Sequence, residues 1–182
     1  MNRPAVGIIE LNSLALGTVV CDAMLKRAPV EVVESHTICP GKFIVIVAGE
    51  VDDVKEAMEA GRHYASYCMT DSIVIENLHE QVLPAMQGAN RVPEISAVGL
   101  LETWVSPSCV IAADAACKAA EIRLIEVRIA NGLGGKAFMT LTGELHEVEA
   151  AIAAATKAVT SGQLIRTEII PAPHQAVKPT LF

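Results

Sequence analysis

The sequence predicts an α+β chain made of two tandem copies of one domain, each with an antiparallel sheet and helices on one of its faces. The first observation is a repeat: Ala5-Val6-Gly7-Ile8-Ile9-Glu10 returns in the second half as Ala97-Val98-Gly99-Leu100-Leu101-Glu102. The second is that glycine, charged and turn positions along both halves recur in register. The third is that each half alternates strand-like and helix-like segments in the same order. Chance is a poor explanation of such agreement, so the repeat decides the domain organisation.

The register between the two copies holds along most of the chain once two extra residues are allowed in the second copy. We therefore expect a first domain over residues 1–88, a linker over residues 89–95 and a second domain over residues 96–182. The matching positions are Asp22 and Asp114, Lys26 and Lys118, Ala28 and Ala120, Glu34 and Glu126, Gly41 and Gly135, Lys42 and Lys136, Gly49 and Gly143, Glu50 and Glu144, Val54 and Val148, and His79 and His174.

In the first copy, the opening run from Ala5 is rich in isoleucine and valine and predicts a strand. Two further apolar runs flank Pro40-Gly41, a dipeptide typical of a turn, and predict two strands joined by a loop. Asp52 is the expected N-cap of the second helix. The expected elements are strands at 5–11, 30–38, 43–48 and 72–76, helices at 14–27 and 51–67, and a turn of helix near His79.

The second copy repeats this pattern, and the order in each copy is β-α-β-β-α-β. That order is the ferredoxin-like arrangement, an antiparallel sheet with its helices on one face. The fold alone identifies no function, because it hosts many. The expected elements of the second copy are strands at 97–103, 122–130, 137–142 and 165–170 and helices at 106–119 and 145–160.

Composition restricts the class of protein. The chain has 182 residues, of which 52% are hydrophobic and 19% charged, and its mean hydropathy is +0.41. The longest segments without a charged side chain, 11–21 and 103–113, are far shorter than the roughly 20 residues of a spanning helix. We therefore expect the apolar surface to be buried in subunit contacts and not in a membrane. A net charge of -7 with no basic cluster and few aromatic residues argues against nucleic-acid binding.

The five cysteines are scattered, with no C-x-x-C pair, which indicates neither a disulfide framework nor a zinc site within one chain. Reduced thiols and the lack of a signal peptide at the N-terminus predict a cytoplasmic protein. Cys39 differs from the others because it lies on the Pro40-Gly41 turn. Cys21 and Cys117 fit buried small apolar residues in helices, and Cys68 and Cys109 lie near helix ends.

The two copies share further motifs besides the repeated opening segment. These are Asp22-Ala23-Met24-Leu25-Lys26 and Asp114-Ala115-Ala116-Cys117-Lys118 in the first helices, Gly143-Glu144-Leu145-His146-Glu147-Val148 at the second helix of copy two, and Ile169-Ile170-Pro171-Ala172-Pro173-His174 at its end. With these motifs each copy resembles a bacterial microcompartment (BMC) shell domain, and the whole chain resembles the tandem-domain shell proteins. The resemblance implies a homotrimer that imitates a hexagon, tiles with other shell proteins and forms part of a microcompartment shell in the cytoplasm.

The loop Ile38-Cys39-Pro40-Gly41-Lys42-Phe43 looks like that of the propanediol-utilisation type within this family. In that type the equivalent cysteine binds an iron–sulfur cluster at the trimer centre. Three-fold symmetry repeats each residue about the axis, so the resemblance implies three Cys39 thiolates holding one [4Fe–4S] cluster per trimer. Zinc is the competing metal, because three thiolates and one exchangeable ligand also suit its tetrahedral geometry.

The second copy has a glycine-rich loop, Asn131-Gly132-Leu133-Gly134-Gly135-Lys136, at the same place. It fails the phosphate-binding spacing, because Ala130 stands at the first glycine position and Ala137 follows the lysine. Glycines allow close backbone approach, so we expect both loops to line the pore: Pro40, Gly41 and Lys42 from the first copy, and Asn131, Gly132, Leu133, Gly134 and Gly135 from the second.

Lys26 and Lys118 have two interpretations. Each is spaced to pair with an aspartate one helical turn earlier, and the resemblance implies contacts across the shell edges. The sequence shows no catalytic constellation and predicts a protein that is not an enzyme. Three functions are open: a shell tile with a redox centre that passes electrons across the shell, with a redox enzyme of the lumen or cytosol as a further partner; a shell tile with a small-molecule pore and no metal; and a trimeric sensor of small ligands.

Overall fold

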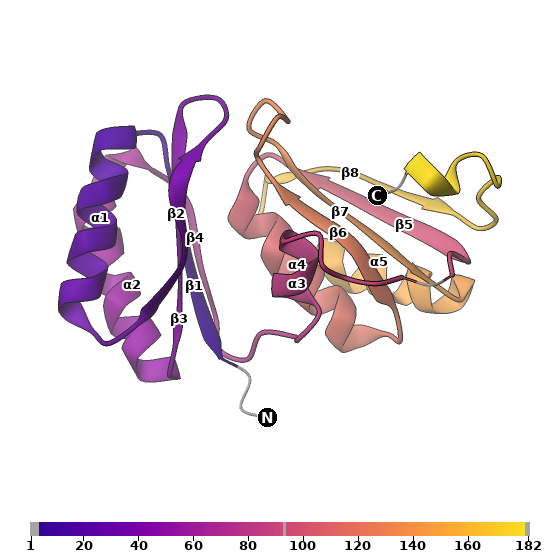
Figure 1. Cartoon of the computed structure of the whole chain (residues 1–182), viewed down its shortest axis with the longest axis horizontal. Helices are drawn as coiled ribbons and strands as arrows, with labels where there is room; N and C mark the ends of the chain where they lie inside the picture. Colours follow the sequence, from indigo (N-terminus) through magenta and orange to yellow (C-terminus); the bar gives the residue numbers. More distant parts are fainter. Residues whose placement is uncertain (1–3, 93, 181–182) are drawn as a thin grey trace. The chain divides into compact units, whose positions relative to one another are not determined.

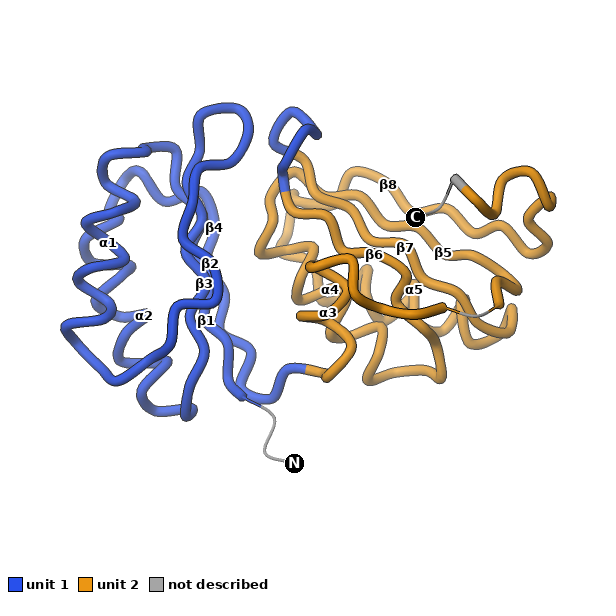
Figure 2. Tube along the Cα trace, in the orientation of Figure 1, with its two compact units in different colours: residues 1–78, 130–135 blue, residues 79–129, 136–182 orange. Residues whose placement is uncertain are grey.

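The computed structural model describes residues 4–92 and 94–180 (Figure 1). It divides into two compact units (Figure 2). Unit 1 contains residues 1–78 together with 130–135, and unit 2 contains residues 79–129 together with 136–182. The short segment 130–135 is the loop of the second copy. Its contacts group it with the domain of the first copy.

Unit 1 has one four-stranded antiparallel sheet in the order β2-β3-β1-β4, and its two long helices lie together on one face of that sheet (Figure 1). The hairpin β2–β3 and the crossover helices give the predicted β-α-β-β-α-β order. The elements are β1 (Ala5–Leu11), α1 (Leu14–Arg27), β2 (Glu31–Ile38), β3 (Lys42–Gly49), α2 (Val51–Ala65), a 3₁₀ turn (Ser66–Cys68) and β4 (Met69–Ile75).

The helix-facing core of unit 1 depends on close approach between sheet and helices. Every residue of β1 is buried, and Ile9 and Leu11 belong to the core cluster that packs under the helices. A Cβ added at Gly7 would lie 2.5 Å from Met58 on α2, so the missing side chain is what allows the helix to pack there. Ser13 caps α1, its hydroxyl accepting a hydrogen bond from the Leu16 amide.

Unit 2 repeats the architecture with a sheet in the order β6-β7-β5-β8. The residues before β5 cover the sheet face opposite the helices, where Ile95 packs with Val98 and Ile125. Lys178, near the end of the described chain, donates a hydrogen bond to the Ile95 carbonyl at 2.6 Å. The elements are α3 (Val82–Met86), β5 (Ala97–Thr103), α4 (Ser106–Ala119), β6 (Arg123–Ile129), β7 (Ala137–Gly143), α5 (Leu145–Ala158), β8 (Leu164–Ile170) and a 3₁₀ turn (Lys178–Thr180).

The α+β class, the repeat and the element order are confirmed, and the opening strand and first helix of each copy have the predicted bounds. Four local predictions are wrong. The helix expected at 145–160 ends at Ala158. The N-cap of α2 is Glu50, and Asp52 lies within the first turn. That helix ends at Ala65, because Ser66 has a positive φ of 47°. The strand expected from Ser72 begins at Met69. Among the described residues, no helix is long and apolar enough to cross a membrane.

Candidate functional site: the β2–β3 loop and its surroundings

The loop between β2 and β3 is short and exposed. Strand β2 ends at the buried Ile38 and β3 begins at Lys42, which leaves Cys39, Pro40 and Gly41 as the turn. Gly41 has a φ of +78°, a conformation that favours glycine. Both Cys39 and Pro40 are exposed. The thiol of Cys39 therefore stands at the tip of a hairpin whose base is anchored in the core.

The side chain of Lys42 is held below the loop by a buried carboxylate. Its Nζ lies 2.7 Å from Oε1 of Glu10, whose side chain is fully buried, and the Thr70 hydroxyl donates to the same oxygen at 3.2 Å. Glu10 pairs with Ile44 across the strands, so Lys42 is its diagonal neighbour on the same face. The positive charge of Lys42 is therefore neutralised by the Glu10 carboxylate. It is not available to stabilise a thiolate at Cys39.

The second copy has the same ion pair at its own loop. Lys136 Nζ lies 2.9 Å from Oε1 of Glu102, and it also lies 5.5 Å from the ring centre of Trp104. This pair is more exposed, at 38% for Lys136 and 36% for Glu102, against 18% and 0% in the first copy. The sequence analysis missed both pairs. The signal was available, because the repeat keeps the glutamate and the lysine in both copies.

The glycine-rich loop 130–135 has a backbone conformation that favours glycine at several positions. Gly132, Gly134 and Gly135 have positive φ values of 73°, 62° and 91°. A Cβ at Gly135 would lie 2.6 Å from Cδ of Pro40 and 3.3 Å from the Cys39 carbonyl oxygen. Within unit 1 the two loops therefore touch, and glycine is what permits the contact.

The other four cysteines are less accessible than Cys39. Cys21, Cys109 and Cys117 are buried, and Cys68 is half-buried. Burial raises the pKa of the Cys109 thiol to about 12, and burial with the nearby Asp114 carboxylate raises that of Cys117 to about 12. These buried thiols stay protonated at neutral pH and are poor metal ligands, because the thiolate is the ligand form.

Within the described chain, no three histidine, cysteine, aspartate or glutamate side chains are placed to hold a metal ion. The β2–β3 loop thus brings one exposed thiol per chain to its tip. A site with several thiolates at this loop requires several copies of the chain.

Both helix lysines pair with the aspartate one turn earlier. Lys26 Nζ lies 2.6 Å from Asp22 Oδ2, and Lys118 Nζ lies 2.6 Å from Asp114 Oδ2. The side chain of Lys26 is 75% exposed and that of Lys118 is 37% exposed. The two residues keep the same local partner, but the first copy presents its lysine far more openly.

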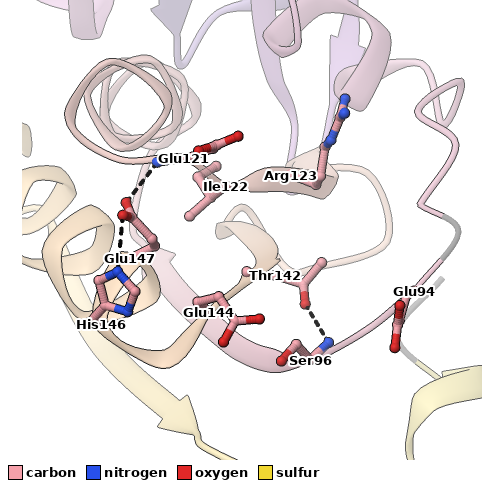
Figure 3. Close-up of a pocket in the computed structure, with 10 residues that line it drawn as sticks. Glu94, Ser96, Glu121, Ile122, Arg123, Thr142, Glu144, His146 and Glu147 are labelled. Atoms are coloured by element: carbon pink, nitrogen blue, oxygen red, sulfur yellow. Dashed lines mark hydrogen bonds and ion pairs between the residues drawn. The ribbon is translucent and has the colours of Figure 1, made fainter.

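A pocket of about 560 Å³ lies in unit 2, where the start of β6 meets the end of β7 and the start of α5 (Figure 3). The Glu147 carboxylate accepts from the Glu121 amide at 2.8 Å and lies 3.2 Å from the His146 ring. Since Arg123 opens β6, this pocket lies at the far end of that hairpin from loop 130–135. It is lined by Glu94, Ser96, Glu121, Ile122, Arg123, Thr142, Gly143, Glu144, His146 and Glu147.

Comparison with known proteins decides the family. Residues 5–78 and 97–173 each match the BMC domain. The chain belongs to the BMC-domain family. It is 41% identical over 174 residues to the bacterial microcompartment shell protein PduT of Citrobacter freundii, an alignment that covers 95% of either protein. It is also 30% identical over 186 residues to the carboxysome assembly protein CcmO of Synechococcus elongatus, covering 94% of this chain and 66% of that protein.

Solved structures agree with the BMC assignment. The crystal structure of a microcompartment protein from Desulfitobacterium hafniense matches with a TM-score of 0.86 at 39% identity, over 97% of this chain and 99% of that one. A fused permuted hexameric shell protein of the RMM microcompartment matches with a TM-score of 0.64 at 23% identity, over 86% of this chain and 81% of that one, which shows the fold alone. The predicted resemblance is confirmed: the chain is a tandem BMC-domain shell protein of the PduT type. Such a protein has a structural role and is not an enzyme. Its place is a microcompartment shell, together with other shell proteins.

Proposed function

We propose that the chain forms a homotrimeric, pseudohexameric shell tile in which three Cys39 thiolates meet on the three-fold axis and hold one [4Fe–4S] cluster. When bound, such a cluster would carry electrons across the shell. The observation that carries the proposal is the exposed Cys39 at the tip of a short, anchored hairpin. In a closed ring, one residue per chain is enough to supply a symmetric set of three ligands.

The donor chemistry of this chain fits the cluster. Iron–sulfur clusters are held by cysteine thiolates, and Cys39 is the most exposed of the five cysteines, while three of the others are buried. Three thiolates leave one iron to bind water, a small molecule or a partner side chain. The backbone N–H groups of the glycine-rich loop 130–135, which touches Pro40, are suited to stabilise the anionic sulfur ligands.

The ion pair below the loop has a positioning role in this proposal. Lys42 and the buried Glu10 tie the base of the hairpin to β1. They fix where Cys39 emerges without placing an uncompensated charge beside the thiolate. Pro40 and Gly41, with Asn131, Gly132, Leu133, Gly134 and Gly135, would line the remaining opening.

The edges of the tile follow from the helix lysines. We propose that Lys26 and Lys118 contact neighbouring tiles; in the single chain both side chains reach the surface, at 75% and 37% exposure. We also keep the functional division of the chain into residues 1–88, a linker at 89–95 and residues 96–182. A redox enzyme of the lumen or cytosol is the partner that electron transfer requires.

The test is anaerobic purification, with iron, sulfide and zinc assayed against the trimer concentration and the absorption spectrum recorded. A brown protein with four irons per three chains is expected, and Cys39→Ser should lose colour and iron while staying trimeric. Cys68→Ser is the matched control, since Cys68 is the other cysteine with an accessible side chain, and it should keep the cluster. Stoichiometric zinc without sulfide would assign Cys39 to zinc, and a metal-free protein after reconstitution would leave a tile with a small-molecule pore.

A further inference from the structure

The segment that follows the last strand is repeated in the two copies. We name residues 79–86 arm 1 and residues 174–179 arm 2. Both begin with histidine and continue with valine and proline at the same spacing: His79, Val82 and Pro84 in arm 1, and His174, Val177 and Pro179 in arm 2.

The two arms also share one local conformation. In arm 1 the His79 carbonyl accepts from the Val82 amide at 3.0 Å, and in arm 2 the His174 carbonyl accepts from the Val177 amide at 2.9 Å. Each histidine ring also accepts, through Nδ1, from the amide two residues later, at 3.3 Å in arm 1 and 3.2 Å in arm 2. The arms are therefore the same structural element, present twice.

Arm 1 is bound to a defined surface of unit 2. The His79 amide donates to Asp114 Oδ1 at 2.8 Å, while Oδ2 of the same carboxylate holds Lys118. The Gln81 side chain bridges the Ile122 carbonyl and the Leu124 amide, both at 3.0 Å. Val82 of the arm is fully buried. Arm 1 thus occupies a receiving face formed by α4 and the start of β6.

The first copy carries the equivalent receiving face on α1 and β2, and there it is exposed. Asp22 is 57% exposed where Asp114 is 7% exposed. Val32 is 42% exposed where Leu124 is fully buried. Asp22 already holds its own lysine through Oδ2, as Asp114 does.

Arm 2 is correspondingly exposed. Val177 is 39% exposed where Val82 is fully buried, and His174 is exposed. Each chain therefore exposes arm 2 and the α1/β2 face. These two surfaces are equivalent to arm 1 and the α4/β6 face, which are already in contact within unit 2.

We propose that arm 2 of one chain docks on the α1/β2 face of a second copy, with the His174 amide donating to Asp22 Oδ1 and with Val177 covering Val32. This inference rests on the proposed trimer and names the surfaces that join it. An arm and a face at different places on one chain make a head-to-tail contact, and such a contact closes into a ring when the rotation allows. Arm 2 has Ala176 where arm 1 has Gln81, so the contact between chains lacks the side-chain bridge that fastens arm 1.

The test uses two surface variants, Val32→Asp on the face and Val177→Asp on the arm, with Leu145→Asp as the control. Leu145 is 38% exposed at the start of α5, outside both surfaces. Native mass spectrometry and light scattering at matched concentration give the state of each variant. Each of the first two should raise the dissociation constant of the trimer at least about tenfold, because a carboxylate is buried without a partner, and the control should stay trimeric.

Mixing the two variants gives the sharper readout. The intact arm of Val32→Asp should bind the intact face of Val177→Asp, which forms a one-to-one dimer that cannot close into a ring. His174→Pro removes the donating amide and serves as a second arm variant, also expected to weaken the trimer. Far-UV circular dichroism checks that each variant is folded.

Two results would overturn the inference. If the wild type is trimeric and the face and arm variants are trimeric with unchanged affinity, the arm contact is wrong while the proposed tile stands. A wild-type chain that is monomeric at all concentrations sinks the trimer and the arm contact together.

Discussion

Replacing Lys42 by methionine tests the anchoring of the cysteine loop. The change keeps the length and the apolar stem but removes the charge that faces Glu10. Glu10 is fully buried and Lys42 is 18% exposed, so the variant removes the positive charge that faces a buried carboxylate, while the Thr70 hydroxyl stays within hydrogen-bond distance of that carboxylate. Breaking a buried ion pair costs about 3–5 kcal/mol. The partial exposure of Lys42 and the help of Thr70 favour the lower end, about 3 kcal/mol.

The second copy supplies a matched control in Lys136→Met. That pair is more than one-third exposed on both sides, and exposed pairs contribute about 0–1 kcal/mol. A methionine sulfur also packs well against the Trp104 ring that Lys136 now faces. At about 2–4 °C per kcal/mol for a chain of this size, Lys42→Met should lower Tm by about 6–12 °C and Lys136→Met by less than about 4 °C.

The assay is thermal unfolding followed by circular dichroism, with hydrogen exchange to locate the change. Lys42→Met should speed amide exchange in β1 and β3 of unit 1 and leave β5 and β7 of unit 2 protected. Equal Tm losses in the two variants, or a loss for Lys42→Met that does not exceed that of the control, would refute the anchoring role.

Three further predictions concern other parts of the chain. Iodoacetamide at pH 8, read by peptide mass spectrometry, should label Cys39 first and leave Cys109 and Cys117 unlabelled in the folded protein, because their pKa values are raised to about 12; equal labelling of Cys109 and Cys39 contradicts the burial argument. Gly17→Ala should lower the free energy of unfolding by about 1–3 kcal/mol despite the better helix propensity of alanine, because the new Cβ meets the Phe43 ring; an unchanged urea midpoint argues against that contact. Burial alone lowers the pKa of His36, but its hydrogen bonds to the Thr37 carbonyl and the Glu34 carboxylate raise the pKa overall. The stability that His36 contributes should then be complete below the unfolded-state pKa of about 6.5 and should be lost as pH rises through the folded-state pKa. Over this pH range the Tm of the wild type should fall more than the Tm of His36→Gln. If the two plots of Tm against pH run parallel, His36 makes no such contribution.

The repeat explains why so much of the fold was predictable. Hydrophobic periodicity within one copy leaves the bounds of helices and strands uncertain. The second copy supplies an independent pattern in the same register: Gly7 and Gly99, for example, occupy the same position in the two opening strands. Errors occurred where local backbone conformation decides. Ser66 ends α2 through a positive φ that serine rarely adopts, so no composition signal marks that end.

The site was predictable in part. The turn at Pro40-Gly41 placed Cys39 on an exposed loop, and the structure agrees. The direction of Lys42 was not predictable from its own neighbours, because its partner Glu10 lies on another strand and becomes a diagonal neighbour through the register of β1 with β3. The receiving face for the arms was missed for a similar reason. His79 and His174 matched in the sequence, but only the exposure of Asp22 and Val32 against Asp114 and Leu124 shows that one of two equivalent faces is open.

The central claim is that the metal site belongs to the assembly and needs all three Cys39 thiols. The most direct measurement is native mass spectrometry of trimers assembled anaerobically from wild-type and Cys39→Ser chains, one of them mass-tagged. The trimers with three, two, one and no wild-type chains then separate by mass. We predict that the cluster mass is found on trimers with three wild-type chains and is absent from the other species. Cluster mass on trimers with two, one or no wild-type chains, or on none of the trimers, would contradict the claim.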